Sequence, residues 1–575
     1  MSPSNQQKQV EKTLVDQTNL LPRARLIIVF GTLAFAFLIT YADQNGIAVI
    51  LPTMARDLNA QDTISWAGTS SFVGNTVFQV LYGRLSDIFG RKVVYLSALI
   101  LLAVGDILCA TAKNGPSLYI FRALAGIAMG GVNSLTMIIV SDIVTLQQRG
   151  YYQGLLGGCI GLGNIIGPFV SAAFAETSSW RNFFYLLGPL AAASAVISFF
   201  LVPSSMPPRN RKETFSMIDY YGIVTGSIAI VFFLVPISGG GSYFNWTSPM
   251  VISMLAISAV AFAAFLFVEW RVSRLPVMPL SMFKTPAVSV ILVQNFLFGF
   301  AYYAALYYLP IYFQNVLGYS PIGASGLLVP FVAVQMIFSV GSGLYISKSG
   351  RYGEVIWSGF LLWTLSVFLF PLTPPYIVFW LANQSGAVSM CFFSRTTDPA
   401  IIGIVGAITG AGVGNVFQPC LIALQAHSPK AQRAVVISNR NFLRSLGGAV
   451  GLAVSAQVMQ SSLRNSLPSH LRSLVSSSYS IPSFNNLPSA DIEALLNAYM
   501  TGSHNVFLVL APFMGLCLLG CFLVKDRGLA RKEEVKEEKQ VSAQTEGSVK
   551  KDESVQAGEQ SIMQKHDVET LPSKA

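Results

Sequence analysis

The stretch GRLSDIFGRK, residues 83–92, separates two long apolar segments and is the most specific pattern in the chain. Gly83 has no side chain, so two helices can approach each other closely at that position. Asp87 falls at the end of the preceding segment, where a neighbouring helix N-terminus or Arg91 would neutralise its carboxylate. Gly90 supplies the turn that follows. An ordinary basic loop explains the positive residues of this stretch but not its Gly-Asp-Gly spacing.

The composition indicates a protein embedded in a membrane. Of the 575 residues, 53% are hydrophobic and 11% are charged, and the mean hydropathy is +0.55. Soluble proteins have about a quarter of their residues charged, and one soluble core cannot bury so much apolar surface. The apolar residues also occur in runs of about 20, the length of a helix that crosses a bilayer. We predict an all-α polytopic membrane protein with about 14 spans.

Lysine and arginine are concentrated in alternate loops, and this asymmetry predicts the orientation. The short loops after the second, sixth, eighth, tenth and twelfth spans carry basic residues, whereas the odd-numbered loops carry few. Basic loops stay in the cytosol, so both termini are expected to face that side. The sequence Asn-Trp-Thr at 245–247 falls in an odd loop and predicts N-glycosylation of Asn245 on the opposite side. No apolar leader precedes the first span, which is therefore expected to direct insertion.

The residue types favour a transporter over a receptor, a channel or a membrane-embedded enzyme. Only four histidines occur, and the sequence has no metal-ligand spacing and no phosphate-binding glycine loop. The six cysteines are interpreted as small buried hydrophobes rather than as a disulfide framework. We therefore expect no enzymatic activity, no metal and no cofactor. We also expect no nucleic-acid partner, because membrane topology explains the net charge of +10. The 48 glycines, many of them within spans, suit helices that rock against each other.

Residues 83–92 resemble the signature loop of the major facilitator superfamily, G-x-L-a-D-r-x-G-R-K. The matching residues are Gly83, Leu85, Asp87, Gly90, Arg91 and Lys92. By this resemblance they form a conformational gating motif on the cytosolic side. The segment FRALAGIAMGG, residues 121–131, resembles a second motif of the family and places Arg122 in the fourth span. An arginine at membrane depth is costly, so it should face a cavity or a carboxylate.

The segment GLGNIIGPFVSAAF, residues 161–174, resembles the antiporter motif of the same family through Gly163, Gly167 and Pro168. Its closing pair of glycines is replaced by serine and alanine, which are still small. In the family this motif marks exporters rather than symporters. The segments SSWRNFFYL and ISNRNFLRSLGGAVG extend the resemblance to the fourteen-span drug:proton antiporter branch, over roughly residues 26–460. That branch includes fungal-type multidrug exporters and vacuolar carriers of basic amino acids.

This resemblance implies a major facilitator fold, with two six-helix bundles around a central cavity and an inserted two-helix hairpin. The expected parts are a disordered cytosolic N-terminus (1–25), a first bundle (26–203), the inserted helices with a cytosolic linker (204–275), a second bundle (276–524) and a disordered cytosolic tail (525–575). A long outer loop is expected over 461–503. Residues 374–393 fit neither neighbouring span; they are interpreted as a re-entrant or interfacial segment, or as a gene-model error.

The stretch YADQNGIAVILP, residues 41–52, places an acid inside the first apolar run. Asp43 lies about 17 residues beyond Leu26, or about 25 Å along a helix. Arg122 enters the fourth span from the other side and lies at a similar depth, so the two are predicted to be neighbours. Burial and a nearby cation act on the protonation of a carboxyl in opposite directions. The resemblance ties this acid to proton coupling; a structural ion pair is the alternative.

Other polar residues at membrane depth are candidates for the transport path. Asp106 in the third span is a second proton-coupling candidate; it either has a structural partner or, if it reaches the cavity, favours a cationic substrate. The candidate substrate cavity consists of Gln44, Asn45, Gln294, Asn295, Phe300 and Tyr303, which offer amide dipoles and flat aromatic surface. Arg440 and Arg444 are expected to hold loops or Asp87. Span-end acids, such as Asp142 and Glu269, are expected to be solvated or to cap helices.

These observations predict a secondary active transporter, a proton-coupled antiporter that exports drugs, toxins or other amphipathic organic molecules by alternating access. A vacuolar or organellar carrier of basic amino acids is the alternative, and a membrane sensor without flux is a third. The expected partners are a small-molecule substrate, protons and the lipid bilayer, with the proton gradient as the energy source. The protein is expected to act as a monomer in the plasma membrane or the vacuolar membrane.

Overall fold

The computed structural model describes residues 21–60, 63–64, 66–204, 217–240, 244–368, 390, 393–395, 397–429, 432–471, 488–526 and 528–529. All of the described helices lie in one compact unit that ends at Asp526. Within the described residues, the only strand-like feature is a single bridge between Gly240 and Phe244. The predicted all-α fold is confirmed.

The first six-helix bundle consists of α2 (Arg23–Asp57), α3 (Trp66–Phe89), α4 (Arg91–Ala110), α5 (Gly115–Ile143), α6 (Leu146–Thr177) and α7 (Arg181–Leu201). Helix α2 packs against α5, α6 and α7, while α3 and α4 both pack against α5. Local signals start two of these helices. Asn114 caps α5 by accepting a hydrogen bond from the Ser117 N–H, and Thr145 forms a reciprocal capping box with Gln148 at the start of α6.

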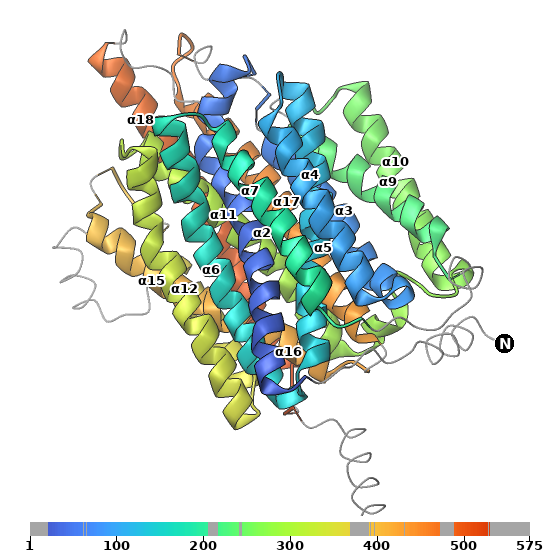
Figure 1. Ribbon diagram of the computed structural model, residues 1–575. Helices are drawn as coiled ribbons and strands as arrows, with labels where there is room; N and C mark the ends of the chain where they lie inside the picture. The colour runs from blue at the N-terminus through green and yellow to red at the C-terminus, as the bar shows by residue number, and fades with distance from the viewer. Residues whose placement is uncertain are drawn as a thin grey trace, which may run out of the picture. The chain divides into compact units, whose positions relative to one another are not determined.

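The inserted hairpin consists of α9 (Tyr220–Gly239) and α10 (Pro249–Phe267), and a π-helical turn, Val268–Val272, extends α10. Figure 1 shows this pair in green at one edge of the helix array. Helix α9 contacts α3 of the first bundle and α17 (Arg433–Ser466) of the second. The hairpin therefore lies along a seam between the two bundles.

The second bundle consists of α11 (Pro286–Asn315), α12 (Pro321–Ser349), α13 (Gly353–Phe368), α15 (Pro399–Phe417) with α16 (Pro419–Ala426), α17 and α18 (Ser489–Gly520). The twelfth span, expected as one helix, breaks between α15 and α16 because Pro419 has no N–H to donate and its ring clashes with the preceding turn. The unusual segment 374–393 lies outside the described residues except for Met390 and Phe393.

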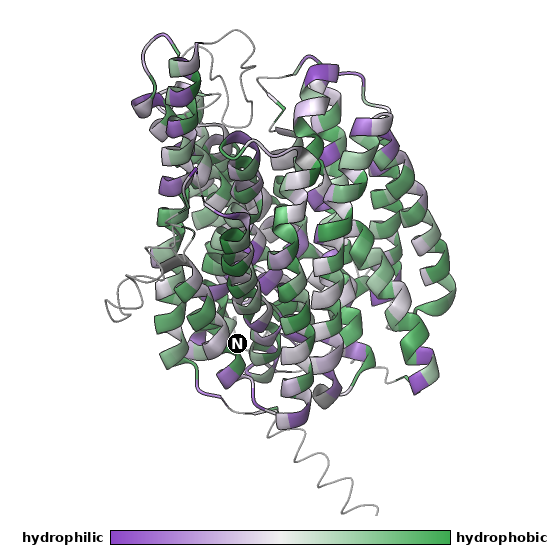
Figure 2. Cartoon of the chain, turned by 90° about the vertical axis from the view of Figure 1, so that its left-hand side faces the viewer, coloured by the Kyte–Doolittle hydropathy of each residue, from purple (hydrophilic) through white to green (hydrophobic). Residues whose placement is uncertain are grey.

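Hydropathy marks most of these helices as membrane-spanning. Within the described residues, twelve helices are long and apolar enough to cross a membrane. Helix α3 carries more polar residues, and α13 has 16 residues, so these two fall short of that criterion although they occupy the second and eleventh positions of the fold. Figure 2 shows hydrophobic residues along the helices and hydrophilic residues gathered toward their ends. The chain is a multi-pass membrane protein.

The predicted outer loop over 461–503 is too long. Helix α17 continues to Ser466, and α18 begins at Ser489, far before the expected start of the last span near residue 504. The early turns of α18 are polar on one side but bury Leu495, Ala498 and Tyr499 on the other. Hydropathy locates the part of a helix that crosses lipid and misses an amphipathic extension beyond it.

A close backbone contact between the bundles joins α6 and α12. Gly150 and Gly343 oppose each other there, so that a Cβ added to Gly150 would lie 2.9 Å from the Gly343 carbonyl oxygen. A Cβ added to Gly154 would lie 3.1 Å from the Gly343 Cα. The two helices are in backbone contact because none of these positions has a side chain.

Candidate transport site

Asp43 and Arg122 form a buried ion pair between α2 and α5. The Arg122 Nη1 donates to Asp43 Oδ1 at 2.7 Å, and the two side chains are 1% and 0% exposed. The guanidinium also lies over the Phe184 ring, 5.6 Å from its centroid, and reaches the Ser71 hydroxyl at 3.4 Å. The predicted proximity of Asp43 and Arg122 is confirmed.

Asp106 on α4 belongs to the same cluster. Its neighbour Gly105 lets α4 approach α5, because a Cβ there would lie 3.0 Å from the backbone of Ala125. The Asp106 carboxyl is fully buried, interacts electrostatically with Asp43 and Arg122, and has no hydrogen-bond partner among the described residues on either oxygen. Two carboxylates buried beside each other are costly to ionise together. With a proton on one of them, one carboxylate, one neutral acid and one guanidinium make an electrically neutral cluster.

The antiporter-like segment of α6 packs against α2 beside this cluster. A Cβ on Gly163 would lie 2.8 Å from the Tyr41 Cβ, and a Cβ on Gly167 would lie 2.8 Å from the Cα of Ala42. Pro168 follows within the same helix. These small residues bring the α6 backbone onto α2 next to Asp43. The sequence match at Gly163, Gly167 and Pro168 thus corresponds to a contact between α6 and α2.

A chain of amides crosses from the first bundle to the second. The Asn45 amide donates to Asn164 Oδ1 at 2.7 Å, and the Asn164 amide donates to the Tyr302 hydroxyl at 2.9 Å. Tyr302 on α11 also pairs with Gln335 on α12 at 3.3 Å. The sequence identified Asn45 but missed its partners, because amides on other helices give no local signal of their direction.

Arg440 and Arg444 point into the interior from α17, which corrects the expectation that they hold loops or Asp87. The Arg440 Nε donates to Asn295 Oδ1 at 2.8 Å, and its other nitrogens donate to Asn441 Oδ1 and to the carbonyl oxygen of Phe417. The Arg444 guanidinium lies 4.5 Å from the Phe417 ring centroid. Both side chains are fully buried, and no carboxylate among the described residues forms an ion pair with either.

Aromatic side chains surround this pair of arginines. The Arg444 Nη2 donates to the Tyr41 hydroxyl at 3.4 Å, and its Nε and Nη1 have no hydrogen-bond partner among the described residues. Tyr303 lies beside Gln44 and edge-on to Phe72, with ring centroids 4.9 Å apart. Residues of α2, α3, α11 and α17 therefore meet at one level of the interior, with two cationic groups at the centre.

Two of the six predicted cavity residues face elsewhere. Gln294 donates to the Cys517 carbonyl of α18 at 2.8 Å, and Phe300 packs on Phe513 of the same helix, with ring centroids 4.4 Å apart. Successive positions on a helix are rotated by about 100°, so Gln294 and Asn295 cannot share a face. Asn295 and Tyr303 are the residues of α11 that reach the arginines.

The signature loop joins the bundles at the end of the array where Gly90 lies, here called the motif side. Asp87 accepts from Arg91 at 2.6 Å, and the Arg91 Nε donates to Asp142 at 3.0 Å. Arg433 of α17 completes the chain with a 3.1 Å ion pair to Asp142. Asp142 is buried and bridges both bundles, which corrects its expected role as a solvated or capping acid.

The remaining residues of the motif hold helices rather than ligands. A Cβ on Gly83 would lie 2.8 Å from the Ser438 Cβ of α17, so this glycine permits contact between the bundles. Gly90 has a φ of 91°, which favours glycine. Lys92 lies over the Phe199 ring, 5.2 Å from its centroid. Asn245, the predicted glycosylation site, is exposed between α9 and α10.

The described residues form fourteen spans around a polar interior, if α15 and α16 are counted as one. This arrangement defines a polytopic membrane transporter. The chain belongs to the Major Facilitator Superfamily, whose sequence model matches residues 33–452.

Known proteins are similar over most of the chain. Citrate exporter 1 of Yarrowia lipolytica is 49% identical over 565 residues, which cover 96% of this chain and 80% of that one. MFS-type transporter clz4 of Cochliobolus lunatus is 41% identical over 520 residues, covering 90% of this chain and 89% of that one. Among solved structures, the proton:xylose symporter XylE has a TM-score of 0.55 at 14% identity, covering 89% of this chain and 98% of that one. The last likeness concerns the fold alone.

Proposed function

We propose that this protein is a proton-coupled exporter of small organic polycarboxylates, the chemical class of citrate. The observation that carries the proposal is the buried pair Arg440 and Arg444, which faces amides, hydroxyls and a carbonyl but no carboxylate among the described residues. A buried cation without a counter-ion is costly unless a ligand supplies the negative charge. The 49% identity to a protein named as a citrate exporter supports the same substrate class.

The geometry gives each side chain a defined task. Two Arg444 nitrogens, Nε and Nη1, have no hydrogen-bond partner among the described residues, so Arg444 would bind one carboxylate of the substrate in a forked geometry. Arg440 would bind a second carboxylate when released from Asn295. Asp43 and Asp106 would take up and release the coupling proton next to Arg122, because two adjoining acids share a proton readily.

Helix α2 links the two sites. It carries Asp43 of the acid cluster, and two residues earlier it carries Tyr41, whose hydroxyl accepts a hydrogen bond from Arg444. A movement of α2 on protonation of Asp43 would therefore change the surroundings of Arg444. In this proposal export runs by alternating access as a proton antiport, in a monomer of the plasma membrane or the vacuolar membrane, with the motif side and both termini in the cytosol.

A second candidate substrate class is amphipathic organic molecules such as drugs and toxins. Tyr41, Tyr303 and Phe417 around Arg444 favour it, because flat aromatic surface suits bulky and partly apolar ligands. Basic amino acids fit less well. A cationic substrate would be repelled by Arg440 and Arg444, while Asp43 is already paired with Arg122 and Asp106 lies in the field of the same guanidinium.

Proteoliposomes with an imposed pH gradient would separate these candidates. We expect gradient-driven flux of radiolabelled citrate, competed by other di- and tricarboxylates but not by lysine or arginine. Gradient-driven flux of a cationic dye without flux of citrate would overturn the polycarboxylate assignment and favour the second class. Gradient-driven lysine flux without either would favour the carrier of basic amino acids, and an absence of all flux in a folded sample would favour a sensor.

A further inference from the structure

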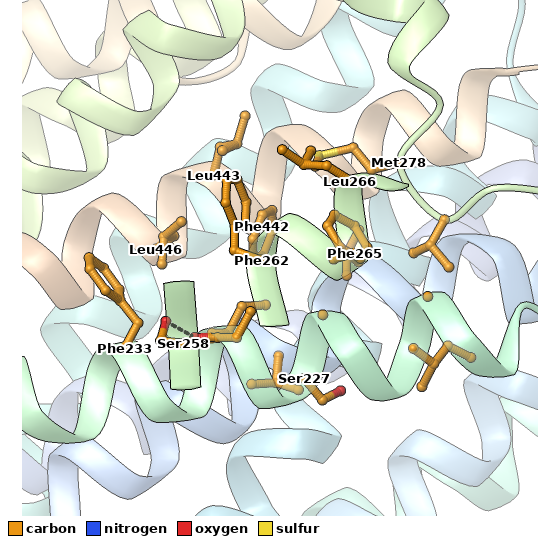
Figure 3. A pocket seen from close by; sticks show the side chains of 18 of the residues that line it. Ser227, Phe233, Ser258, Phe262, Phe265, Leu266, Met278, Phe442, Leu443 and Leu446 are labelled. Atoms are coloured by element: carbon orange, nitrogen blue, oxygen red, sulfur yellow. Dashed lines mark hydrogen bonds between the residues drawn. The ribbon is translucent and has the colours of Figure 1, made fainter. Parts of the chain in front are cut away.

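An apolar cavity lies outside the candidate transport site, beside the inserted hairpin. It has a volume of about 690 Å³ and is lined mainly by α9, α10, α3 and α17. Figure 3 shows Phe262 and Phe265 of α10 facing Phe442, Leu443 and Leu446 of α17 across it. The volume falls in the usual range of small-molecule sites, about 300–1,000 Å³.

The lining offers a ligand little that is polar. Among the described residues its polar side chains are Ser227 and Ser258, and the Ser258 hydroxyl already donates to the Ala229 carbonyl at 2.7 Å. Phe262 and Phe283 line the cavity and are 51% and 37% exposed, so the cavity is open to the surface beside the hairpin. This lining suits an apolar chain that enters from the bilayer.

Exposed cations lie where the cavity ends on the motif side. Lys284 directly follows the lining residue Phe283, and Arg271 lies five residues beyond the lining residue Leu266, or about 7.5 Å of helix rise. Arg274 lies in the connection between them, and all three are exposed. Basic residues at a membrane surface attract anionic lipid headgroups, at about 1 kcal/mol each.

The acids at this end do not cancel that charge at the surface. Both oxygens of Glu269 accept backbone N–H groups, from Val277 and Met278 at 3.1 Å each, and the side chain is buried. Asp219 caps α9 by accepting from the Gly222 N–H at 2.9 Å. Among the residues that the structure describes, the accessible charge beside the cavity is therefore positive.

We infer that the cavity holds an acyl chain of an anionic phospholipid from the leaflet on the motif side, with its phosphate at Arg271, Arg274 and Lys284. The site goes beyond the proposed transport function and needs no substrate. Its consequence for the protein follows from α17, which carries Leu443 and Leu446 toward the lipid chain and Arg440 and Arg444 toward the interior. The bound chain fills the space between the hairpin and both bundles at the helix that carries the two arginines.

Photo-crosslinking of the full chain in nanodiscs tests this inference. The probe is phosphatidylglycerol with a diazirine in the middle of one acyl chain, compared with phosphatidylcholine that has identical chains. We expect the anionic probe to label peptides of α9, α10 and residues 442–450, with about a 10- to 100-fold preference over the zwitterionic probe. Equal labelling by the two probes would overturn the assignment of an anionic headgroup.

Matched variants separate the chain site from the headgroup site. Leu446→Trp fills the cavity and should abolish labelling of its lining, whereas Ile257→Trp, exposed on the outer face of α10, should not. Lys284→Gln should lower labelling by the anionic probe about 5-fold, whereas Lys348→Gln, exposed at the end of α12, should leave it unchanged.

Two further results would refute the inference. One is equal labelling of the Leu446→Trp and Ile257→Trp variants. The other is full displacement of the anionic probe by an equimolar sterol or apolar dye, which would assign the cavity to that molecule instead. Lys284→Gln changes only an exposed residue, so the inference stays testable even if Leu446→Trp fails to fold. All of these measurements read binding without transport, so their failure is distinguishable from failure of the proposed function.

Discussion

The two bundles differ in whether a buried arginine has a carboxylate counter-ion. In the first bundle, Arg122 lies against Asp43 and next to Asp106, so its charge is neutralised within the protein. In the second, Arg440 and Arg444 are equally buried, and within the described part of the chain they contact amides, a hydroxyl, a ring and a carbonyl. The first arrangement can exchange protons without a ligand. The second leaves a charge that no described carboxylate neutralises. Under the proposed function, the first bundle would therefore handle the proton and the second would bind the substrate.

Removal of the acid in the first bundle should have the largest effect. Asp43→Asn leaves Arg122 without its closest counter-ion, and the loss of one partner of a buried pair costs about 3–5 kcal/mol. Flux driven by a pH gradient should fall by at least about 100-fold, while binding of citrate at fixed pH persists. The measurement is proteoliposome flux with and without the gradient. Asp57→Asn, which affects an exposed pair with Arg181, is the control. Normal coupling in Asp43→Asn would show that the acid is structural.

Removal of a cation in the second bundle should weaken substrate binding rather than coupling. Arg444→Gln removes two free donors, and hydrogen bonds to charged groups contribute about 1.5–3 kcal/mol. The KM for citrate should rise about 10- to 100-fold, with the dependence of flux on the pH gradient retained. Arg464→Gln on the exposed end of the same helix should behave as the unmodified protein does. An unchanged KM in Arg444→Gln would refute the role of the pair in binding.

A third change would make the second bundle resemble the first. Asn295→Asp replaces the amide oxygen that Arg440 contacts at 2.8 Å with a carboxylate of almost the same shape. The guanidinium would then have an internal counter-ion, and the affinity for citrate should fall about 10-fold. Isothermal titration with citrate measures this directly, with Asn295→Ala as the control that removes the contact without adding charge. Equal affinities of the two variants would mean that charge at Arg440 does not govern binding.

The smallest effect is expected at the motif side, where charges of both bundles meet. Arg433→Gln removes one of the two ion pairs of Asp142 and leaves the pair with Arg91. The population opened at this side should rise about 5-fold. A Ser438→Cys reporter beside Gly83 measures it by its rate of reaction with a water-soluble thiol reagent. A rate equal to that of Ser438→Cys alone would show that the Arg433 pair does not hold the bundles together.

Depth along a helix was predictable from the sequence, whereas rotation about the helix axis was not. Counting residues from the ends of the spans put Asp43 and Arg122 at one level, and the structure joins them at 2.7 Å. The same counting could not show that Gln294 faces α18 while Asn295 faces Arg440, since each span is apolar on several sides. Periodicity locates a buried face only when the opposite face is polar, which fails for helices surrounded by lipid and protein.

Contacts between the bundles could not be predicted from the sequence either. Arg433 and Asp142 are 291 positions apart, and each sits near a span end where a solvated charge is the ordinary expectation. The signature loop predicted a neutralised Asp87 because its partner, Arg91, is four residues away. The pairing of Arg433 with Asp142 depends on how α17 packs beside α5, and no local pattern encodes that packing.

The opposed glycines of α6 and α12 limit how this protein can change by mutation. When a large side chain faces a small one, a substitution that adds volume on one helix can be offset by a loss of volume on the other. Gly150 and Gly343 are both already the smallest residue, so neither can shrink to admit a methyl group on its partner. A larger residue at Gly150 therefore cannot be offset by a smaller residue at Gly343, and the reverse also holds. Both positions are expected to stay glycine as the sequence evolves.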